Sequence, residues 1–174
     1  MTDAAAAVDA RATALAAAFR QVETTRMAGL PVLHPRLRVE AVGFQHDLAD
    51  PSVALGVLVT PWFMNLVRLP LDAAAEQALA GIGESRTRAV AVALEADFLG
   101  AYEVSLGRFE VCSLFSPMGL FEDQAGAVAT AREVLSQLRD PAVPARPGVA
   151  SKAAVPDRRA FLFGRRGTDG QARP

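Results

Sequence analysis

The stretch VALGVLVTPWFMNLVRLP at residues 53–70 decides the fold. Residues 53–60 form a continuous run of β-branched and aliphatic side chains, which is typical of a strand in the interior of a sheet. Pro61 has no backbone N–H to donate, so we expect the first strand to end there and a second to run over 63–69. The stretch therefore predicts two short strands joined by a turn.

Further strands are predicted on both sides of this pair. Upstream, residues 37–44 alternate between apolar and charged side chains, with Leu37, Val39 and Ala41 on one face, as in a half-buried strand. The Ala-, Gly- and Glu-rich residues 71–85 suit a short helix. Extended patterns then return in three segments, at 86–94, 97–104 and 108–115.

Two amphipathic helices flank the strands. Near the N-terminus, apolar residues at intervals of four and three predict a helix of roughly 20 residues that Gly29 and Pro31 end; its stripe is Val8, Ala12, Leu15, Phe19 and Val22. Glu122 and Asp123 supply the negative charge favoured at the start of a second helix, which Asp140-Pro141 ends. Its apolar stripe is Val128, Ala131, Leu135 and Leu138.

This order predicts an α+β fold: a mainly antiparallel sheet of four to six strands covered by N- and C-terminal helices. We expect one domain over residues 1–139. Residues 140–174 contain a Pro-rich stretch with little apolar surface to bury, DPAVPARPGVAS at 140–151, and are predicted to form a flexible C-terminal tail.

Charge is unevenly divided between these two parts. Residues 1–139 hold 11 basic and 16 acidic side chains, whereas residues 140–174 hold 7 basic and 3 acidic. Because affinity for nucleic acid comes mainly from Lys and Arg neutralising phosphates, the acidic body argues against a nucleic-acid partner. The basic tail would attract an acidic partner.

The sequence also indicates the compartment. Asp3 and Asp9 stand where a signal peptide would be basic, and the one cysteine, Cys112, cannot form an intramolecular disulfide. The longest apolar run, residues 53–67, is too short to cross a bilayer and is interrupted by Thr60, Pro61 and Asn65. We therefore expect a cytoplasmic protein without membrane insertion.

The sequence gives little support for a catalytic site or a metal site. The nitrogen and sulfur ligands are His34, His46 and Cys112, and no two of them have ligand spacing. Cys112 lies in a strand pattern without a neighbouring base, and the pair Gly81 and Gly83 lacks the third glycine and the context of a phosphate loop. We expect no enzymatic activity, no cofactor and no bound metal.

Two segments are candidates for binding a partner. The first is Trp62, Phe63 and Met64, at the corner after Pro61. Three large apolar residues in a row are typical of side chains packed in the hydrophobic core, but Trp and Met are also enriched in protein-binding patches. We expect Trp62 to anchor the core, and Phe63 and Met64 to contribute to partner binding.

The second candidate lies in the tail, where apolar residues stand between two arginine pairs: Arg158, Arg159, Phe161, Leu162, Phe163, Arg165 and Arg166. Left uncovered, the apolar trio would expose about 400 Å² or more, beyond what a monomer leaves to solvent. It can dock back onto the domain, or it can bind a partner whose carboxylates match the arginines. Weak attachment to a membrane surface is a third reading.

Four motifs in order resemble the HybE-type chaperones of nickel-iron hydrogenase assembly. They are Leu33-His34-Pro35, Thr60-Pro61-Trp62, Cys112-Ser113-Leu114-x-Ser116-Pro117 and Arg158-Arg159-Ala160-x-Leu162-Phe163-Gly164-Arg165-Arg166. The resemblance implies a cytoplasmic chaperone that binds a hydrogenase subunit precursor. It points to the small subunit with its twin-arginine signal peptide, which the chaperone would hold back from export until cofactors are in place.

The resemblance leaves a second function open, that of a maturation factor aiding iron or electron delivery to the hydrogenase small subunit. One cysteine and two histidines cannot hold an iron-sulfur cluster in a monomer, although a dimer sharing Cys112 is compatible with it. Residues 157–162, Asp-Arg-Arg-Ala-Phe-Leu, also read like the twin-arginine export consensus. This likeness allows the tail to fold into the groove that receives the signal peptide of the bound precursor, and so to compete with it. In the alternative interpretation, the tail is simply an arm that binds the precursor.

Overall fold

The predicted strand pair lies in the interior of a six-stranded sheet. The structure, a computed structural model, describes residues 2–91 and 94–140. β2 (Val53–Val59) and β3 (Met64–Pro70) pair antiparallel over their full length, and every residue of both strands is buried. Burial on both faces explains why this stretch is apolar throughout and does not alternate.

The other strands extend the sheet on either side in the order β1-β2-β3-β6-β5-β4. Their bounds are Glu40–His46 for β1, Ser85–Ala91 for β4, Leu94–Glu103 for β5 and Gly107–Phe115 for β6. All neighbouring strands are antiparallel. Since β3 pairs with β6 and not with β4, the chain leaves the sheet after β3, forms α2 (Ala73–Ala78), and returns at the opposite edge.

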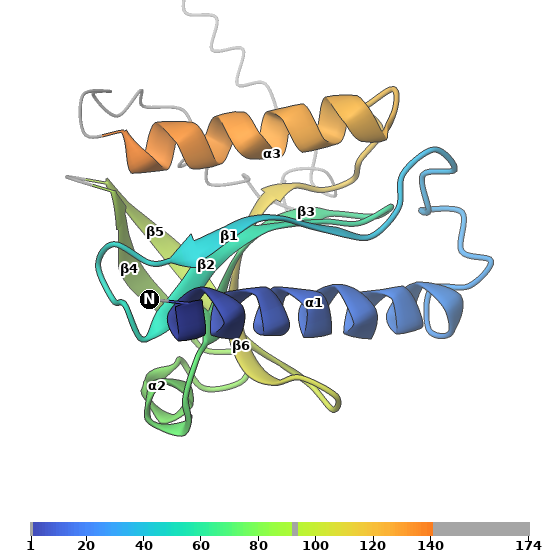
Figure 1. Ribbon diagram of the computed structural model, residues 1–174. Helices are drawn as coiled ribbons and strands as arrows, with labels where there is room; N and C mark the ends of the chain where they lie inside the picture. Colours follow the sequence, from blue (N-terminus) through green and yellow to red (C-terminus); the bar gives the residue numbers. More distant parts are fainter. Residues whose placement is uncertain (1, 92–93, 141–174) are drawn as a thin grey trace, which may run out of the picture.

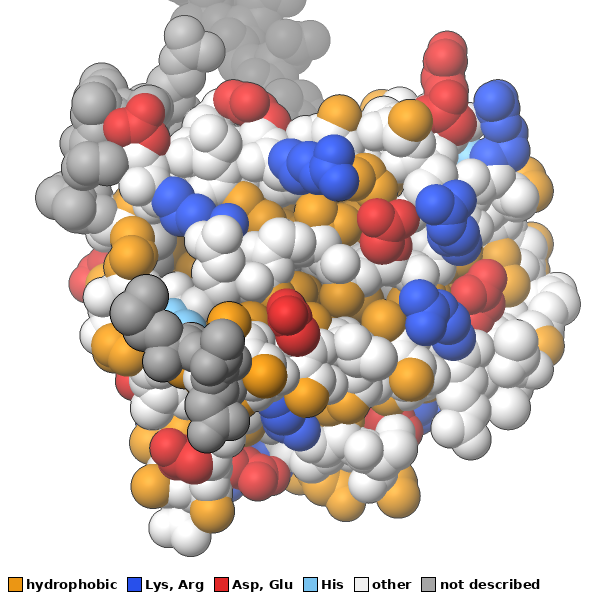
Figure 2. All heavy atoms as spheres, in the orientation of Figure 1, with side chains coloured by type: hydrophobic (Ala, Val, Ile, Leu, Met, Phe, Trp, Pro, Cys, Tyr) orange, Lys and Arg blue, Asp and Glu red, His pale blue; other side chains and the backbone are white. Residues whose placement is uncertain are grey.

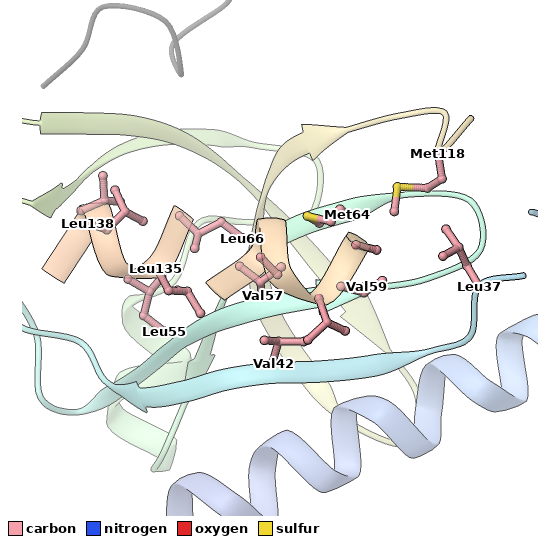
Figure 3. Close-up of a cluster of buried hydrophobic side chains, with 14 of the residues drawn as sticks. Leu37, Val42, Leu55, Val57, Val59, Met64, Leu66, Met118, Leu135 and Leu138 are labelled. Atoms are coloured by element: carbon pink, nitrogen blue, oxygen red, sulfur yellow. The ribbon is translucent and has the colours of Figure 1, made fainter. Parts of the chain in front are cut away.

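Two long helices cover opposite faces of the sheet (Figure 1). On one face, α1 (Thr2–Thr24) packs Val8 and Leu15 against Leu58, Val67 and other strand residues. On the other face, α3 (Gln124–Arg139) packs Ala131 and Leu135 into a second cluster that contains Val57, Leu66 and Phe98 (Figure 3). The predicted α+β class, with a mainly antiparallel sheet between terminal helices, is confirmed.

Local expectations differ from the structure at two element ends. The helix α1 ends at Thr24, before Gly29, and the Thr25 hydroxyl donates a 2.6 Å hydrogen bond to the carbonyl oxygen of Gln21. Regular pairing in β1 starts at Glu40, and Leu37 lies in the α3-side cluster whereas Val39 lies in the α1-side cluster. The prediction that these two residues share a face is wrong, because the chain is not yet in a strand there.

Candidate protein-binding surface

Thr60 holds the corner between β2 and β3 in a fixed shape. Its backbone N–H and its hydroxyl both donate to the carbonyl oxygen of Phe63, each at 2.9 Å. Its oxygen Oγ1 also accepts from the backbone N–H of Phe63 at 2.9 Å and from that of Trp62 at 3.2 Å. The two aromatic residues are therefore presented on a rigid turn.

The side chains of this corner separate onto the two faces of the sheet. Met64 is 0% exposed and belongs to the α3-side cluster, so the expectation that it contributes to a docking surface is wrong. Consecutive strand residues point to opposite faces, and Phe63 accordingly lies on the α1 side. Trp62, expected to anchor the core, is half-buried like Phe63.

Trp62 and Phe63 continue an aromatic cluster that begins on α1. The ring of Phe63 meets that of Phe19 edge to face at a centroid distance of 5.8 Å, and that of Trp62 at 5.5 Å. Phe19 also meets the buried Phe109 at 6.1 Å. The partly exposed rings are thus supported from beneath by packed aromatic side chains, as binding anchors commonly are.

A second apolar surface lies beside α3, and the sequence patterns did not predict it. Because α3 packs mainly against β1 and β2, the part of β5 and β6 on its side of the sheet is incompletely covered. Eight half-buried apolar residues, from β4, β5, β6, the segment before α3 and α3 itself, pack against the α3-side cluster: Ala91, Leu94, Ala96, Cys112, Leu114, Phe115, Phe121 and Val134. The alternation of apolar and polar residues in β5 indicates that one face of this strand is apolar. It does not indicate that α3 covers this face only in part.

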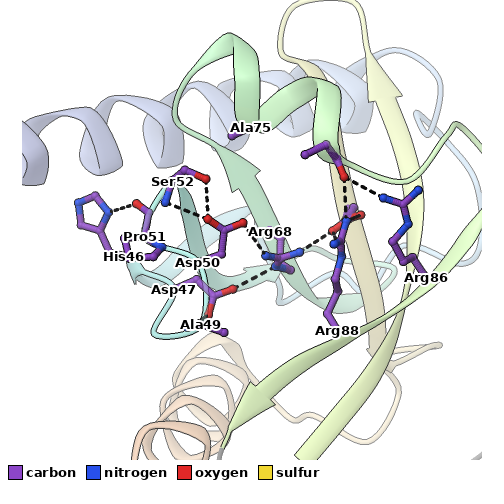
Figure 4. Close-up of polar contacts among 12 residues, drawn as sticks. His46, Asp47, Ala49, Asp50, Pro51, Ser52, Arg68, Ala75, Arg86 and Arg88 are labelled. Atoms are coloured by element: carbon purple, nitrogen blue, oxygen red, sulfur yellow. Dashed lines mark hydrogen bonds and ion pairs between the residues drawn. The ribbon is translucent and has the colours of Figure 1, made fainter.

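Across the same face runs a chain of ion pairs, Asp47 to Arg68 to Glu110 to Arg88 (Figure 4). The N···O distances are 3.1, 2.8 and 2.6 Å in that order. It links the turn after β1 to β3, β6 and β4. In the sequence, Arg68 stands out as a charged residue in a mostly apolar strand. Its partners are far away along the chain, so the sequence does not identify them.

Glu110 is the acceptor at the centre of this chain and is 0% exposed. Burial alone would raise the pKa of its carboxyl group. The hydrogen bonds from Arg88 and from the Ala80 N–H, with the charges of Arg88 and Arg68, outweigh that effect and lower the pKa below its ordinary value. The carboxylate is therefore ionised and fully partnered, as a structural group is.

The remaining candidates do not converge on a reactive centre. His34 and His46 lie in or beside turns, where His34 Nδ1 accepts from the Arg36 N–H and His46 Nδ1 lies 2.8 Å from the Pro51 carbonyl oxygen. Burial, followed by the charge of Asp97, raises the pKa of the half-buried Cys112 thiol. Within residues 2–91 and 94–140, no group of three His, Cys, Asp or Glu side chains is placed to hold a metal ion.

Among the described residues, the face of the body that carries α1 has no basic patch of the kind that binds a polyanion (Figure 2). On the face that carries α1, acidic and basic side chains are interspersed and form no single-sign patch (Figure 2). None of the described helices is both long and apolar enough to cross a membrane. The tail candidates Arg158, Arg159, Phe161, Leu162, Phe163, Arg165 and Arg166 lie outside the described residues.

The fold and these surfaces define a single-sheet α+β protein with partly exposed aromatic and aliphatic side chains suited to binding another polypeptide. A family model for the NiFe-hydrogenase assembly chaperone HybE matches residues 10–164. The chain belongs to this family of hydrogenase assembly chaperones, and the resemblance noted in the sequence is confirmed.

Individual relatives agree with this assignment. The chain is 40% identical over 162 residues to protein HoxT of Cupriavidus necator, covering 89% of both chains. It is 42% identical over 140 residues to the hydrogenase expression/formation protein HupT of Azotobacter chroococcum, covering 79% of this chain and 89% of that one. The solution structure of HybE from Escherichia coli has the same fold, with a TM-score of 0.55 at 22% identity over 90% of this chain and 91% of that one.

Proposed function

We propose that this chain is a cytoplasmic chaperone that binds an immature nickel-iron hydrogenase subunit, the small subunit with its twin-arginine signal peptide, and delays its export. The observation that carries the proposal is the family match across residues 10–164. A binding role is also what the partly exposed aromatic corner suits, and it requires no catalytic residue.

Retention of this kind needs only preferential binding. A protein that binds the immature form and not the mature one shifts the population by mass action. A Kd near micromolar corresponds to about -8 kcal/mol and suffices when both proteins are present at micromolar concentration. The acidic body would also accelerate the encounter with a basic signal peptide.

We assign the binding anchors to two places. Trp62 and Phe63 form the rigid aromatic contact on the body, since aromatic side chains dominate the energetics of protein interfaces. The tail supplies the second set, in which apolar side chains and arginines reach a client: Arg158, Arg159, Phe161, Leu162, Phe163, Arg165 and Arg166.

The experiment is affinity purification of the tagged full-length chain from cells, followed by identification of the bound hydrogenase subunit and of its uncleaved signal peptide. Phe63→Ser is the matched variant. The proposal requires that the precursor co-purifies with the wild type and is depleted with Phe63→Ser. Recovery of only mature, signal-free subunit would refute retention before export.

One relative favours a second candidate function, that of a maturation factor aiding iron or electron delivery to the small subunit. The chain is 37% identical to a Rhodobacter capsulatus protein named probable rubredoxin HupJ, of whose length it covers 45%. This chain has a single cysteine, so it cannot alone supply the four thiolates of an iron-sulfur cluster. Purified protein with stoichiometric iron and visible absorbance would favour this candidate; colourless protein that co-purifies with the precursor would favour the chaperone.

A further inference from the structure

A cavity of about 320 Å³ opens where α3 ends. It is lined by the turn after β1, by β4 and by the end of α3, through Asp47, Leu48, Ala49, Ala89, Val90, Ala91, Leu138 and Arg139. The turn after β1 and strand β4 belong to opposite ends of the strand order, so the sheet curls toward α3 and brings its two edges together here. Ala49 is labelled in Figure 4, and Leu138 in Figure 3.

The lining is suited to an apolar ligand. The carboxylate of Asp47 is held by Arg68 Nε at 3.1 Å and by the Ala49 N–H at 3.0 Å. Arg139 Nη2 donates to the carbonyl oxygen of Gly43 at 2.6 Å. Both charged groups therefore have partners. The other described residues of the lining are aliphatic, and Leu48 among them has 77% of its surface exposed.

The cavity also borders an unpaired strand edge. β4 is the last strand of the sheet, and no described strand pairs with its outer side. An extended segment laid along that edge would gain main-chain hydrogen bonds and place alternate side chains in the cavity. The ligand that fits is therefore an extended peptide with two apolar side chains separated by one residue.

We propose that the chain's own segment Phe161-Leu162-Phe163 occupies this cavity in the client-free protein, with Phe161 and Phe163 inserted and Leu162 facing away. Residues i and i+2 of an extended segment share a face, which puts both phenyl rings on the same side. A cavity of about 150 Å³ accommodates one benzene molecule, so 320 Å³ has room for two rings.

Chain connectivity favours this occupant over a separate molecule. The described chain ends at Asp140, next to Leu138 and Arg139 in the cavity wall. Residues 141–160 can span up to about 70 Å when extended, so they can return residue 161 to a cavity whose wall includes Leu138 and Arg139. Linkage also gives the segment an effective concentration on the order of millimolar, so a weak contact is enough to fill the site. The inference goes beyond the proposed function and does not depend on it.

Disulfide trapping in the full-length Cys112→Ser chain tests the proposal. Ala49→Cys with Gly164→Cys places one thiol at the cavity wall and one beside the apolar trio. Ala125→Cys with Gly164→Cys is the matched control, because Ala125 is also an exposed alanine but lies at the other end of α3, about 20 Å away at 1.5 Å per residue.

Under mild oxidation at low protein concentration, we expect the Ala49 pair to form the intramolecular disulfide at least about tenfold faster than the control pair. That advantage should disappear when Phe161→Ser and Phe163→Ser are added. Equal rates for the two pairs, or a covalent dimer as the main product, would overturn the proposal. Amide resonances give a cysteine-free measurement: Phe161→Ser/Phe163→Ser should shift those of Val90 and Leu138 and leave that of Leu120 unchanged, and unchanged resonances throughout would also overturn it.

Discussion

Arg68 on β3 and Glu110 on β6 form an ion pair of 2.8 Å in the interior of the protein, where their side chains are 4% and 0% exposed. Asp47 and Arg88 hold the two ends of this pair, and the Arg68 guanidinium also lies 5.9 Å from the ring centre of Phe98. Burial removes water from both charges, so each depends on the other for compensation. Through Asp47 and Arg88, this chain of ion pairs connects the turn after β1 with β4, the two elements that line the cavity beside α3.

Removing the carboxylate should therefore destabilise the fold. Glu110→Gln removes the negative charge that Arg68 and Arg88 share, and breaking a buried pair in this way costs about 3–5 kcal/mol of unfolding free energy. Urea denaturation measures the change. Glu95→Gln, at an exposed position on β5, is the control and should stay within about 0.5 kcal/mol of the wild type. Equal stability of the two variants would contradict a structural role for the pair.

The same carboxylate predicts sensitivity to acid. The pKa of Glu110 is lower in the folded chain than the value of about 4.3 for an unperturbed glutamate, so its ionised form stabilises the fold above that pH. This stabilisation is lost as the pH falls through the folded pKa. We expect the difference in unfolding free energy between wild type and Glu110→Gln to shrink as the pH is lowered below about 4. A difference that stays constant down to pH 2 would show that the charge is not responsible.

At the β2–β3 corner, we expect Met64 to contribute mainly to stability and its neighbour Phe63 mainly to client binding. Met64→Ser removes a fully buried side chain and should lower the unfolding free energy by about 2–5 kcal/mol. Phe63→Ser removes a half-buried ring and should leave the melting temperature within a few degrees, but weaken client binding about tenfold or more. Thermal unfolding and calorimetric titration with the precursor distinguish the two; a Phe63→Ser chain that binds normally would remove this residue from the interface.

Deleting residues 157–174 tests competition between the tail and the client by the sign of the effect. If Phe161 and Phe163 fill a site that the signal peptide also uses, the deletion removes a tethered competitor. The isolated signal peptide should then bind several-fold more tightly in calorimetry. A tail that acts only as a client-binding arm gives the opposite result, and weaker or unchanged binding would exclude competition between the tail and the signal peptide.

Local sequence patterns were sufficient to predict the helices and strands whose apolar residues recur at regular spacing. The three- and four-residue spacing of the apolar stripe from Val8 to Val22 predicted α1, and Val8, Leu15 and Val22 of that stripe are buried. The strand predictions at 53–60 and 63–69 agree with β2 and β3 to within a residue at each end. The disagreement over Met64 arose because a strand pattern shows which residues alternate but not which face receives the larger share of the core.

The sequence by itself determined the secondary structure elements, the α+β class and the family, because these depend on spacing and on short motifs along the chain. Only the tertiary structure decided that β3 pairs with β6 and that the two sheet edges meet beside α3. Arg68 and Glu110 are 42 residues apart, and the sequence around either residue does not indicate that the other is its partner. Strand pairing at such separation is selected by the burial of the whole sheet, so the ion-pair chain and the cavity exist only once all six strands are in place.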